Sequence, residues 1–208
     1  MAHLPPSSFV IRTDNFLVRP LTRDDANPAL ESWSEDEGAM EMLNATLQRW
    51  SIAEQVAYFS RYAGSRSRYL LGLFPNGRDV AIGMFIVKVR LADSVMLLTH
   101  VLGDKEWRGT GASREASIGI FDYFFNTLGF EKAKANVRSD NKAMQWLLLN
   151  GGWRQEAYLL KHLRLKSSGD RSDLLLYGIL ADEWRAKRGS SVTVPRRKRE
   201  KSGSVGRP

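Results

Sequence analysis

The segment from Arg108 to Ser113, RGTGAS, places a cation and two glycines directly before an apolar run. Glycine lacks a Cβ, so the amides of Gly109 and Gly111 can turn toward one point and a ligand can reach the backbone. The first amides of a helix have no partner inside it, and the helix dipole favours an anion there. The segment therefore suits a phosphate or pyrophosphate. The alternative is a tight turn whose glycines only allow close packing.

Several other chemistries are excluded by what the sequence lacks. No G-x-x-x-x-G-K-[ST] segment is present, which disfavours a P-loop NTPase. The dinucleotide fingerprint G-x-G-x-x-G is also absent, because Arg114 stands where its third glycine would be. The sequence contains no cysteine, so disulfides, thiolate metal sites and a cysteine nucleophile are excluded.

A strand and a helix must position the RGTGAS segment. Residues 95–102 (VMLLTHVL) are apolar and β-branched, which predicts a core strand that ends just before the loop. A helix is expected to begin close to Ser113. Its apolar face follows the helical spacing of Ala116, Ile120, Phe124 and Leu128.

The other segments predict a mixed α+β sheet. Strands are expected at residues 16–19, 68–75, 78–90, 132–138, 157–166 and 173–180, with a hairpin turn at Asn76-Gly77. Helices are expected at 35–44, at 51–65 with Ser51 as cap, near 141–150, and after a cap at Asp24 or Asp25 with Pro28 close to its start. This order implies an antiparallel meander, one β-α-β crossover around the loop and a closing hairpin.

The net charge of +8 lies in one segment. Residues 185–208 contain nine Lys or Arg and one Glu, whereas the rest of the chain is neutral. We expect one domain at 9–184, a flexible terminus at 1–8 and a disordered basic tail at 185–208. Such a tail can contact nucleic acid or a ribosome, or it can be a solvated extension. No apolar run approaches 18 residues and no signal peptide is evident, so we expect a cytoplasmic protein without membrane contact.

The stretch LGDKEWRGTGASREA resembles the acetyl-coenzyme A binding motif of the GCN5-related N-acetyltransferases (GNAT), R/Q-x-x-G-x-G/A. Arg108, Gly111 and Ser113 fill that pattern, and the flanking GDKEW and REA resemble the RimJ/RimL-like branch. FLVRPLTRDDA, NVRSDNKAMQWLLLNGGWRQEA and DLLLYGILADEW resemble further elements of that branch in matching order. The resemblance covers residues 9–184.

The resemblance implies a mostly antiparallel sheet flanked by helices, and direct acetyl transfer from acetyl-CoA to a primary amine in a ternary complex. The acceptor would be a protein N-terminus or a small amine. Apart from the resemblance, we expect a monomer or homodimer and no metal. The implied CoA-binding residues are Val101, Leu102, Arg108, Gly109, Thr110, Gly111, Ala112, Ser113 and Asn141. A backbone amide near Val101 would stabilise the oxyanion.

The proton donors usual in the family are missing. A Tyr is expected seven positions after Asn141 and a Ser three positions after it, but Leu148 and Met144 stand there. Ser139, Tyr158 or bound water can substitute, or the thiolate leaves without help. A catalytically weak acyl-CoA-binding module is therefore the alternative function.

For proton removal, His100 is the histidine in the predicted central strand, and its ordinary pKa of about 6.5 suits a base near neutral pH. The alternative is a packed structural histidine. By the resemblance, Glu35 and Glu37 line the acceptor side, where they can attract a cationic amine. The alternative for these two acids is a solvated helix face.

Overall fold

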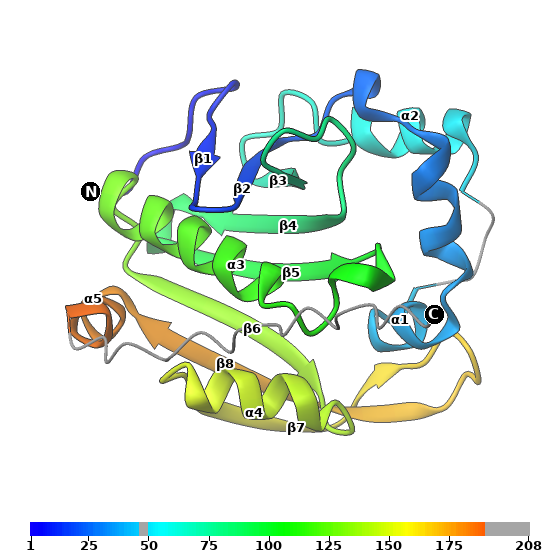
Figure 1. Ribbon diagram of the computed structural model, residues 1–208. Coiled ribbons are helices and arrows are strands. Elements are labelled where there is room, and N and C mark those ends of the chain that lie inside the picture. Colours follow the sequence, from blue (N-terminus) through cyan, green and yellow to red (C-terminus); the bar gives the residue numbers. More distant parts are fainter. Residues whose placement is uncertain (46–49, 190–208) are drawn as a thin grey trace, which may run out of the picture.

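Eight strands form one mixed sheet in the computed structural model, which describes residues 1–45 and 50–189 (Figure 1). The strand order is β1-β2-β3-β4-β5-β6-β8-β7, and every neighbouring pair is antiparallel except β5 and β6. The strands are β1 (Ile11–Arg12), β2 (Phe16–Pro20), β3 (Arg68–Pro75), β4 (Gly83–Arg90), β5 (Val95–Leu102), β6 (Lys132–Arg138), β7 (Arg154–Arg164) and β8 (Arg171–Leu180). The expected α+β fold with one parallel crossover is confirmed.

Five α-helices accompany the sheet within the described ranges. They are α1 (Glu37–Met42), α2 (Ile52–Ser60), α3 (Ala112–Asp122), α4 (Lys142–Asn150) and α5 (Ala181–Gly189). Short 3-10 helices occur at Arg23–Asp25, Pro28–Glu35, Leu91–Asp93 and Lys105–Trp107, and a π-helical turn at Tyr123–Thr127 extends α3. None of the described helices is long and apolar enough to cross a membrane.

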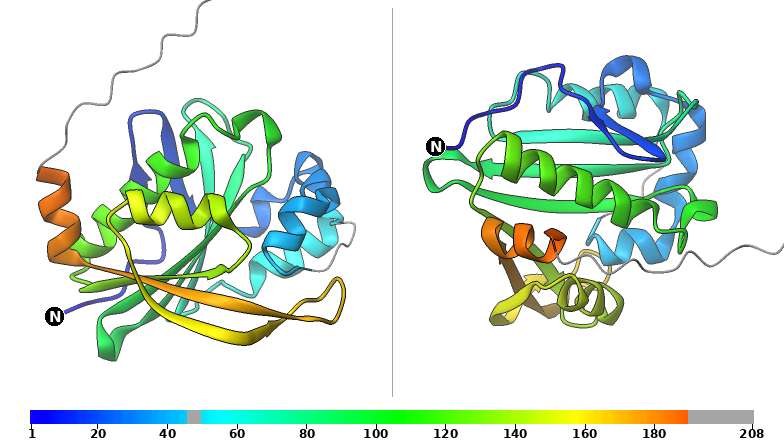
Figure 2. Two further views of the ribbon diagram at one scale, coloured as in Figure 1. Left: turned by 90° about the horizontal axis from the view of Figure 1, so that it is seen from below. Right: turned by 60° about the vertical axis from the view of Figure 1, so that its left-hand side comes forward.

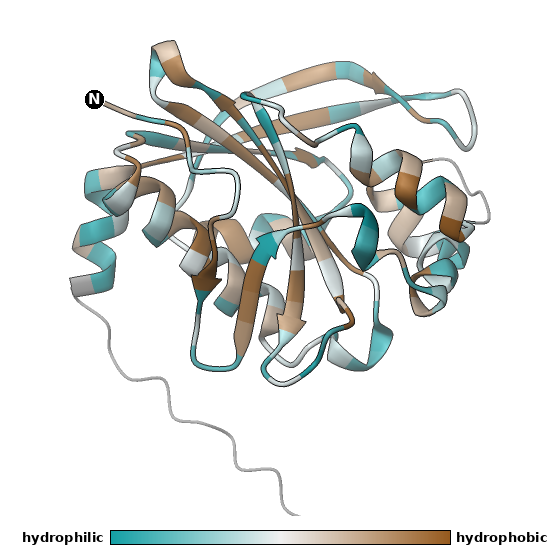
Figure 3. Cartoon of the chain, turned by 90° about the horizontal axis from the view of Figure 1, so that it is seen from above, coloured by the Kyte–Doolittle hydropathy of each residue, from teal (hydrophilic) through white to brown (hydrophobic). Residues whose placement is uncertain are grey.

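One face of the sheet, called the core face below, packs against α3, α4 and α5 (Figure 2). Phe85, Val87, Met96, Ala133 and Tyr177 belong to this face, and each is at most 1% exposed. The predicted stripe of α3 and its extension packs here, since Ala116, Ile120, Phe124 and Leu128 are all buried. The central strands are accordingly coloured mostly as hydrophobic, whereas α5 is largely hydrophilic (Figure 3).

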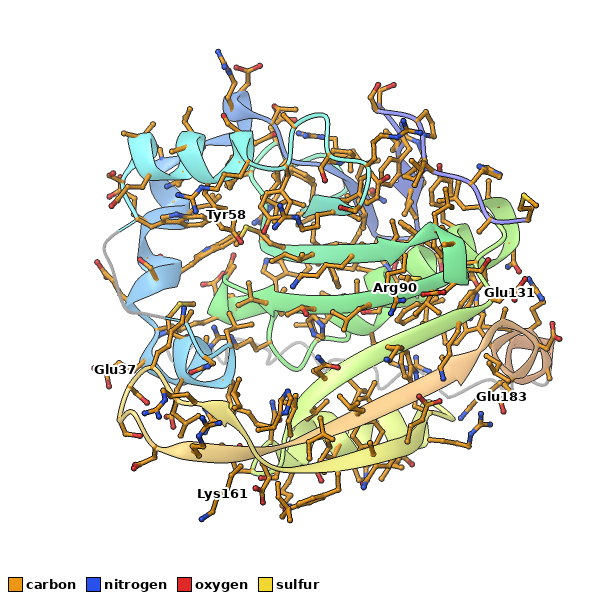
Figure 4. All side chains as sticks on the ribbon, turned by 180° about the vertical axis from the view of Figure 1, so that it is seen from behind. Glu37, Tyr58, Arg90, Glu131, Lys161 and Glu183 are labelled. Atoms are coloured by element: carbon orange, nitrogen blue, oxygen red, sulfur yellow. The ribbon has the colours of Figure 1, made fainter. Side chains whose placement is uncertain are left out.

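The opposite face is covered over only part of its width. Leu30 and Trp33 of the 3-10 helix Pro28–Glu35 and Phe59 of α2 pack on Leu70 and Phe74 of β3. Beyond β4 the described helix on this face is α1, which lies at the C-terminal ends of β5 and β6, so most of β5, β6 and β8 is not covered by a helix there (Figure 4). The second, smaller core therefore stabilises the first half of the sheet.

The two parallel strands β5 and β6 separate along their length. Residues Val95, Met96 and Leu97 pair with 132–134, and no pairing follows beyond them. The strands then diverge toward their C-terminal ends (Figure 1). This divergence leaves an opening in the sheet that begins at Leu98 and extends to the C-terminal ends of β5 and β6. The RGTGAS segment follows the end of β5, beside this opening.

Most predicted elements are confirmed, including the strands at 95–102 and 132–138 and the helix capped by Ser51. Asn27, and not Asp24 or Asp25, caps the 3-10 helix that begins at Pro28, because its side chain accepts from the Ala29 amide. The Asn76-Gly77 turn forms, but β4 begins only at Gly83.

Both ends of the expected domain differ from the prediction. Ala2 is buried and the His3 amide donates to the Leu128 carbonyl, so part of the terminus 1–8 packs on the domain. At the other end α5 continues to Gly189, and Arg185 donates to the Phe125 carbonyl. The predicted tail therefore includes five helical residues, 185–189, and its remainder, 190–208, lies outside the described residues.

Candidate active site

Gly109 and Gly111 have backbone conformations that other residues rarely adopt, with φ of +73° and +93°. A Cβ built at either position would meet no atom within 4 Å, so close packing requires neither glycine. Gly103 differs, because a Cβ there would lie 1.9 Å from the Trp33 indole. The loop glycines are therefore needed for a left-handed backbone, which contradicts the packing-only alternative.

The loop leaves amide groups without protein partners. Within residues 1–45 and 50–189, the amides of Gly109, Gly111, Ser113 and Arg114 donate to no protein acceptor. The remaining amides of the segment are used internally: Arg108 donates to the Lys105 carbonyl at 3.1 Å, Thr110 to the Trp107 carbonyl at 3.3 Å and Ala112 to the Thr110 hydroxyl at 3.4 Å. Since α3 begins at Ala112, these donors and the helix dipole together favour an anion.

The Arg108 side chain is engaged away from these amides. Its Nε and Nη2 donate to the Leu102 carbonyl at 3.2 and 3.0 Å, and its Nη1 lies 2.6 Å from Asp36 Oδ2. The guanidinium therefore links the end of β5 to the start of α1. This geometry does not support the prediction that its charge holds the phosphate.

A cavity of about 760 Å³ adjoins the first turn of α3. Thr110, Gly111 and Arg114 line one side of it, and Arg78 of the β3–β4 connection lines another. The Arg78 guanidinium lies 5.8 Å from the centre of the Trp107 ring. Arg114 is exposed and makes no ion pair with any described residue. Neither arginine was predicted from the sequence as a cation beside the loop, although Arg114 directly follows the motif.

Asp36 is the buried acid of the acceptor-side segment, with 9% exposure. Its Oδ1 caps α1 by accepting from the Ala39 amide at 3.1 Å. That hydrogen bond and the Arg108 guanidinium hold the pKa of Asp36 below its usual range, although burial opposes the shift. Glu35 and Glu37 are exposed, and Glu37 lies at the outer edge of the molecule (Figure 4). Their placement favours the solvated-face alternative.

The other end of α1 is held by β6. Arg138, the last residue of β6, is only 5% exposed and donates from Nη1 to the Glu41 carbonyl at 2.6 Å. The same guanidinium pairs with Asp140, with Nη2 to Oδ2 at 2.5 Å. Through Asp36 and Glu41, α1 therefore connects the diverging ends of β5 and β6, and it closes one end of the opening between them.

The backbone of β5 presents alternate residues to this opening. The Val101 carbonyl faces β4, since a Cβ added to Gly83 would lie 2.8 Å from its oxygen. The amide and carbonyl of one strand residue point to the same side, so the Val101 amide faces β4 too. The Leu102 carbonyl faces the other way and accepts from Arg108. Alternation thus favours the amides of His100 and Leu102, and not that of Val101, as oxyanion donors.

The His100 imidazole lies on the core face. It stacks on the Phe85 ring, with 5.4 Å between ring centres and 26° between planes. Burial lowers the pKa of His100 to about 4, although the side chain keeps some solvent exposure. Such a weak base is poorly matched to proton removal near neutral pH. The geometry favours the packed-histidine alternative over the predicted base.

The residues that follow β6 leave one side-chain amide without a described partner. Asn141 caps α4, with its Oδ1 accepting from the Met144 amide at 3.1 Å, and its amide nitrogen donates to no described residue. Leu148 is 8% exposed in the core and Met144 packs against the core. Neither can donate a proton, because a leucine or methionine side chain has no N–H, O–H or S–H group. Ser139 is partly buried, and its hydroxyl makes no hydrogen bond to a described residue.

Tyr158 is far from the opening. It lies on the edge strand β7, with β8 between that strand and β6. Its hydroxyl donates to Asp173 at 2.5 Å, and this hydrogen bond raises the pKa of Tyr158. The placement disfavours Tyr158 as a proton donor to a group between β5 and β6.

These residues fit an acyl-CoA better than a metal. The loop offers free amides and a helix terminus to a pyrophosphate, and the divergence of β5 and β6 leaves strand edges for an extended chain. No group of three or more His, Asp or Glu side chains in the described ranges is arranged to hold a metal ion.

A model of the acetyltransferase (GNAT) domain matches residues 15–154. The chain belongs to the GNAT acetyltransferase family. It is therefore an acetyltransferase that uses acetyl-CoA, as this family generally does in N-acetylation. No curated protein matches the chain.

Solved structures of GNAT proteins share the fold. A protein from Chromobacterium violaceum described as a probable acetyltransferase of the GNAT family is similar at 19% identity with a TM-score of 0.77, covering 88% of this chain and 91% of that one. A GCN5-related N-acetyltransferase from Brucella melitensis is similar at 17% identity with a TM-score of 0.77, covering 91% and 87%. Spermidine N-acetyltransferase from Vibrio cholerae, solved with CoA and spermine, is similar at 16% identity with a TM-score of 0.71, covering 82% and 98%.

Proposed function

We propose that this GNAT protein transfers the acetyl group of acetyl-CoA to a primary amine through the opening between β5 and β6. The observation that carries the proposal is the set of free amides at Gly109, Gly111, Ser113 and Arg114, on a loop whose glycines have positive φ. These amides hold the pyrophosphate, and Arg114 adds the charge first assigned to Arg108. The Asn141 amide nitrogen contacts the CoA arm from the β6 side.

The reaction takes place where the strands diverge. The amine attacks the thioester carbonyl, the C–N bond forms, and the C–S bond breaks as the thiolate leaves. The amides of His100 and Leu102 stabilise the oxyanion that forms between these steps. Water removes the amine proton, because His100 is packed and weakly basic. The Ser139 hydroxyl, at the end of β6, is the proton donor that the chain offers to the thiolate.

The acceptor approaches from the face opposite the core. The core face is filled by α3 and α4, whereas on the opposite face α1 covers only the C-terminal ends of β5 and β6. Both a protein N-terminus and a small amine fit this access. The motif flanks GDKEW and REA support placement in the RimJ/RimL-like branch, and a cytoplasmic protein is consistent with the absence of cysteine.

An amine panel tests the proposal. Purified protein is incubated with acetyl-CoA and peptides, polyamines or aminoglycosides, while CoA thiol release and product mass are measured together. We expect thiol release that is matched by acetylated amine for at least one acceptor. Thiol release without any acetylated amine contradicts the proposal.

One observation favours a second candidate, a catalytically weak acyl-CoA-binding module. Leu148 and Met144 occupy the positions of the usual proton donors and pack in or against the core. Thermal stabilisation by acetyl-CoA without turnover of any amine would support this module. Absence of stabilisation at millimolar CoA would contradict both candidates.

A further inference from the structure

The bare part of the sheet carries a defined pattern of side chains. Alternation puts Val95, Leu97 and Thr99 of β5 on the face opposite Met96 and Leu98, which are buried in the core. The strand registers align a row across three strands, in which Lys88 of β4 pairs with Leu97 and Leu97 pairs with Lys134 of β6. This row, Lys88-Leu97-Lys134, is called the lysine row below. It lies directly before the point where β5 and β6 diverge.

The neighbouring cations on this face are neutralised. Lys132 Nζ lies 2.6 Å from Glu156 Oε1, and Arg90 Nη2 lies 2.6 Å from Asp93 Oδ2. Glu156 reaches Lys132 across Gly178 of β8, where an added Cβ would lie 2.4 Å from the carboxylate. The absence of a side chain at Gly178 therefore leaves room for the Glu156 carboxylate in this ion pair.

The lysine row has no such compensation. Lys88 is exposed and Lys134 is partly buried, and neither makes an ion pair with any residue of the described ranges. Two strand spacings separate them, or roughly 10 Å. Leu97 between them is only partly buried. The row thus offers two positive charges around a small apolar surface.

We propose that the acceptor is a protein or peptide N-terminus followed by acidic residues, whose carboxylates bind Lys88 and Lys134. This inference rests on the proposed function. An extended peptide rises about 3.3 Å per residue, so with its amine at the divergence its second to fourth residues lie over the lysine row. The charge of the row attracts carboxylates there and repels a polyamine.

The same face is less suited to nucleic acid. Single-stranded nucleic acids bind positive grooves that also present aromatic side chains for base stacking. The residues of β5 and β6 on this face are Val95, Leu97, Thr99, Val101, Lys132, Lys134, Asn136 and Arg138, none of which is aromatic. An acidic peptide is therefore the occupant that the chemistry favours.

The test compares peptides that share the first residue and carry either acidic or basic residues at positions two to four. With full-length protein, we expect kcat/KM to be about tenfold higher for the acidic peptide, and higher than for spermidine. The variant Lys88→Glu with Lys134→Glu should lose this preference or reverse it toward the basic peptide. Arg12→Glu, an exposed position on the far edge strand β1, is the matched control and should keep the preference.

The outcomes distinguish failure of this inference from failure of the proposed acetyltransferase function. Equal kcat/KM for both peptides, or a preference for spermidine, overturns the inference while acetylation itself stands. RNA binding that the double variant loses, without a change in peptide preference, overturns it as well. Acetyl-CoA binding with no amine acetylated overturns both. If the double Glu variant unfolds, as shown by its melting temperature, Lys88→Gln with Lys134→Gln serves as the neutral replacement and should abolish the preference.

Discussion

At the scale of single residues, the site depends on backbone conformation more than on side chains. Gly109 and Gly111 expose amides because their φ angles are positive, and no neighbouring atom would obstruct a side chain at either position. The guanidinium of Arg108, the charged residue of the motif, does not face the anion site, since it binds the Leu102 carbonyl and Asp36. The anion site is thus a property of the turn.

Gly111→Ala tests this role of the backbone. The left-handed conformation costs a non-glycine residue roughly 1–2 kcal/mol, so the loop should change conformation and the affinity for acetyl-CoA should fall about tenfold or more. Gly169→Ala, in the turn between β7 and β8, is the matched control, because Gly169 also has positive φ with no atom within 4 Å of an added Cβ. It should lose comparable stability and keep its affinity in calorimetric titration. Equal affinity loss in both variants would contradict the account.

His100→Gln tests whether the imidazole is the base. A general base contributes about 10²-fold or more to the rate, so a loss of less than tenfold in kcat/KM is expected for a packed histidine. The folded pKa of about 4 lies below the ordinary value of 6.5. Between these pH values the unfolded chain binds a proton that the folded chain does not, so the free energy of unfolding falls as the pH falls. Urea titrations should show that His100→Gln weakens this dependence; an unchanged dependence would contradict the burial argument.

At the scale of elements, α1 is the connection between the two arms of the active site. Asp36 at its start is tied to the end of β5 through Arg108, and the Glu41 carbonyl near its end is tied to Arg138 of β6. Movement of α1 therefore alters both strand ends. The helix also lies beside the opening through which the amine must approach, so it connects the CoA loop with the acceptor side.

Asp36→Asn separates the ion pair from the helix cap, because Asn is as good a cap as Asp. We expect a higher KM for acetyl-CoA and for the amine, with little change in helix content by circular dichroism. In a double-mutant cycle with Arg108→Gln, the coupling energy should be about 1 kcal/mol, reduced by the partial exposure of Arg108. The exposed pair Arg90 and Asp93 is the control and should show coupling near zero. Additive effects of Asp36→Asn and Arg108→Gln would contradict the proposed connection.

The strands were predictable from the sequence because their signals are local. Residues 95–102 and 132–138 match the observed β5 and β6, since apolar and β-branched runs specify buried strands. The strand β1 was not predictable, because its two residues are too few to form a pattern. The helix α5 was not predictable either, because its many charged residues are also typical of a disordered tail. The loop glycines were predictable for the same local reason.

The contacts that complete the site were not predictable. The pair of Arg108 with Asp36 joins residues distant in the sequence, and no local pattern encodes it. The direction of the Val101 amide depends on the register of β5 with β4, and no local sequence pattern specifies that register. Likewise, the pKa of His100 depends on its burial beside Phe85.

At the scale of the whole molecule, the basic C-terminal segment divides into two parts. Arg185 and Arg188 belong to the domain, because Arg185 donates to the Phe125 carbonyl at 3.0 Å and Arg188 pairs with Asp122 at 3.0 Å. Residues 190–208 contain six Lys or Arg and one Glu. We propose that this second part supplies nucleic-acid or ribosome contact.

Two truncations separate these parts. A chain that ends at Gly189 should keep its melting temperature and its acetyl-CoA kinetics, and should lose salt-dependent binding to nucleic acid. A chain that ends at Trp184 should also lose thermal stability, because the contacts of Arg185 and Arg188 with α3 and its extension are removed. Unchanged nucleic-acid binding by the chain ending at Gly189 would contradict the proposed role of residues 190–208.

The most direct test of the proposed site is an amide titration by nuclear magnetic resonance. Isotope-labelled protein is titrated with CoA while the backbone amide signals are followed. The largest shifts should occur at Gly109, Gly111, Ser113 and Arg114, with small shifts at Gly169. Large shifts elsewhere, with these four amides unchanged, would show that CoA binds at another place and would contradict the account.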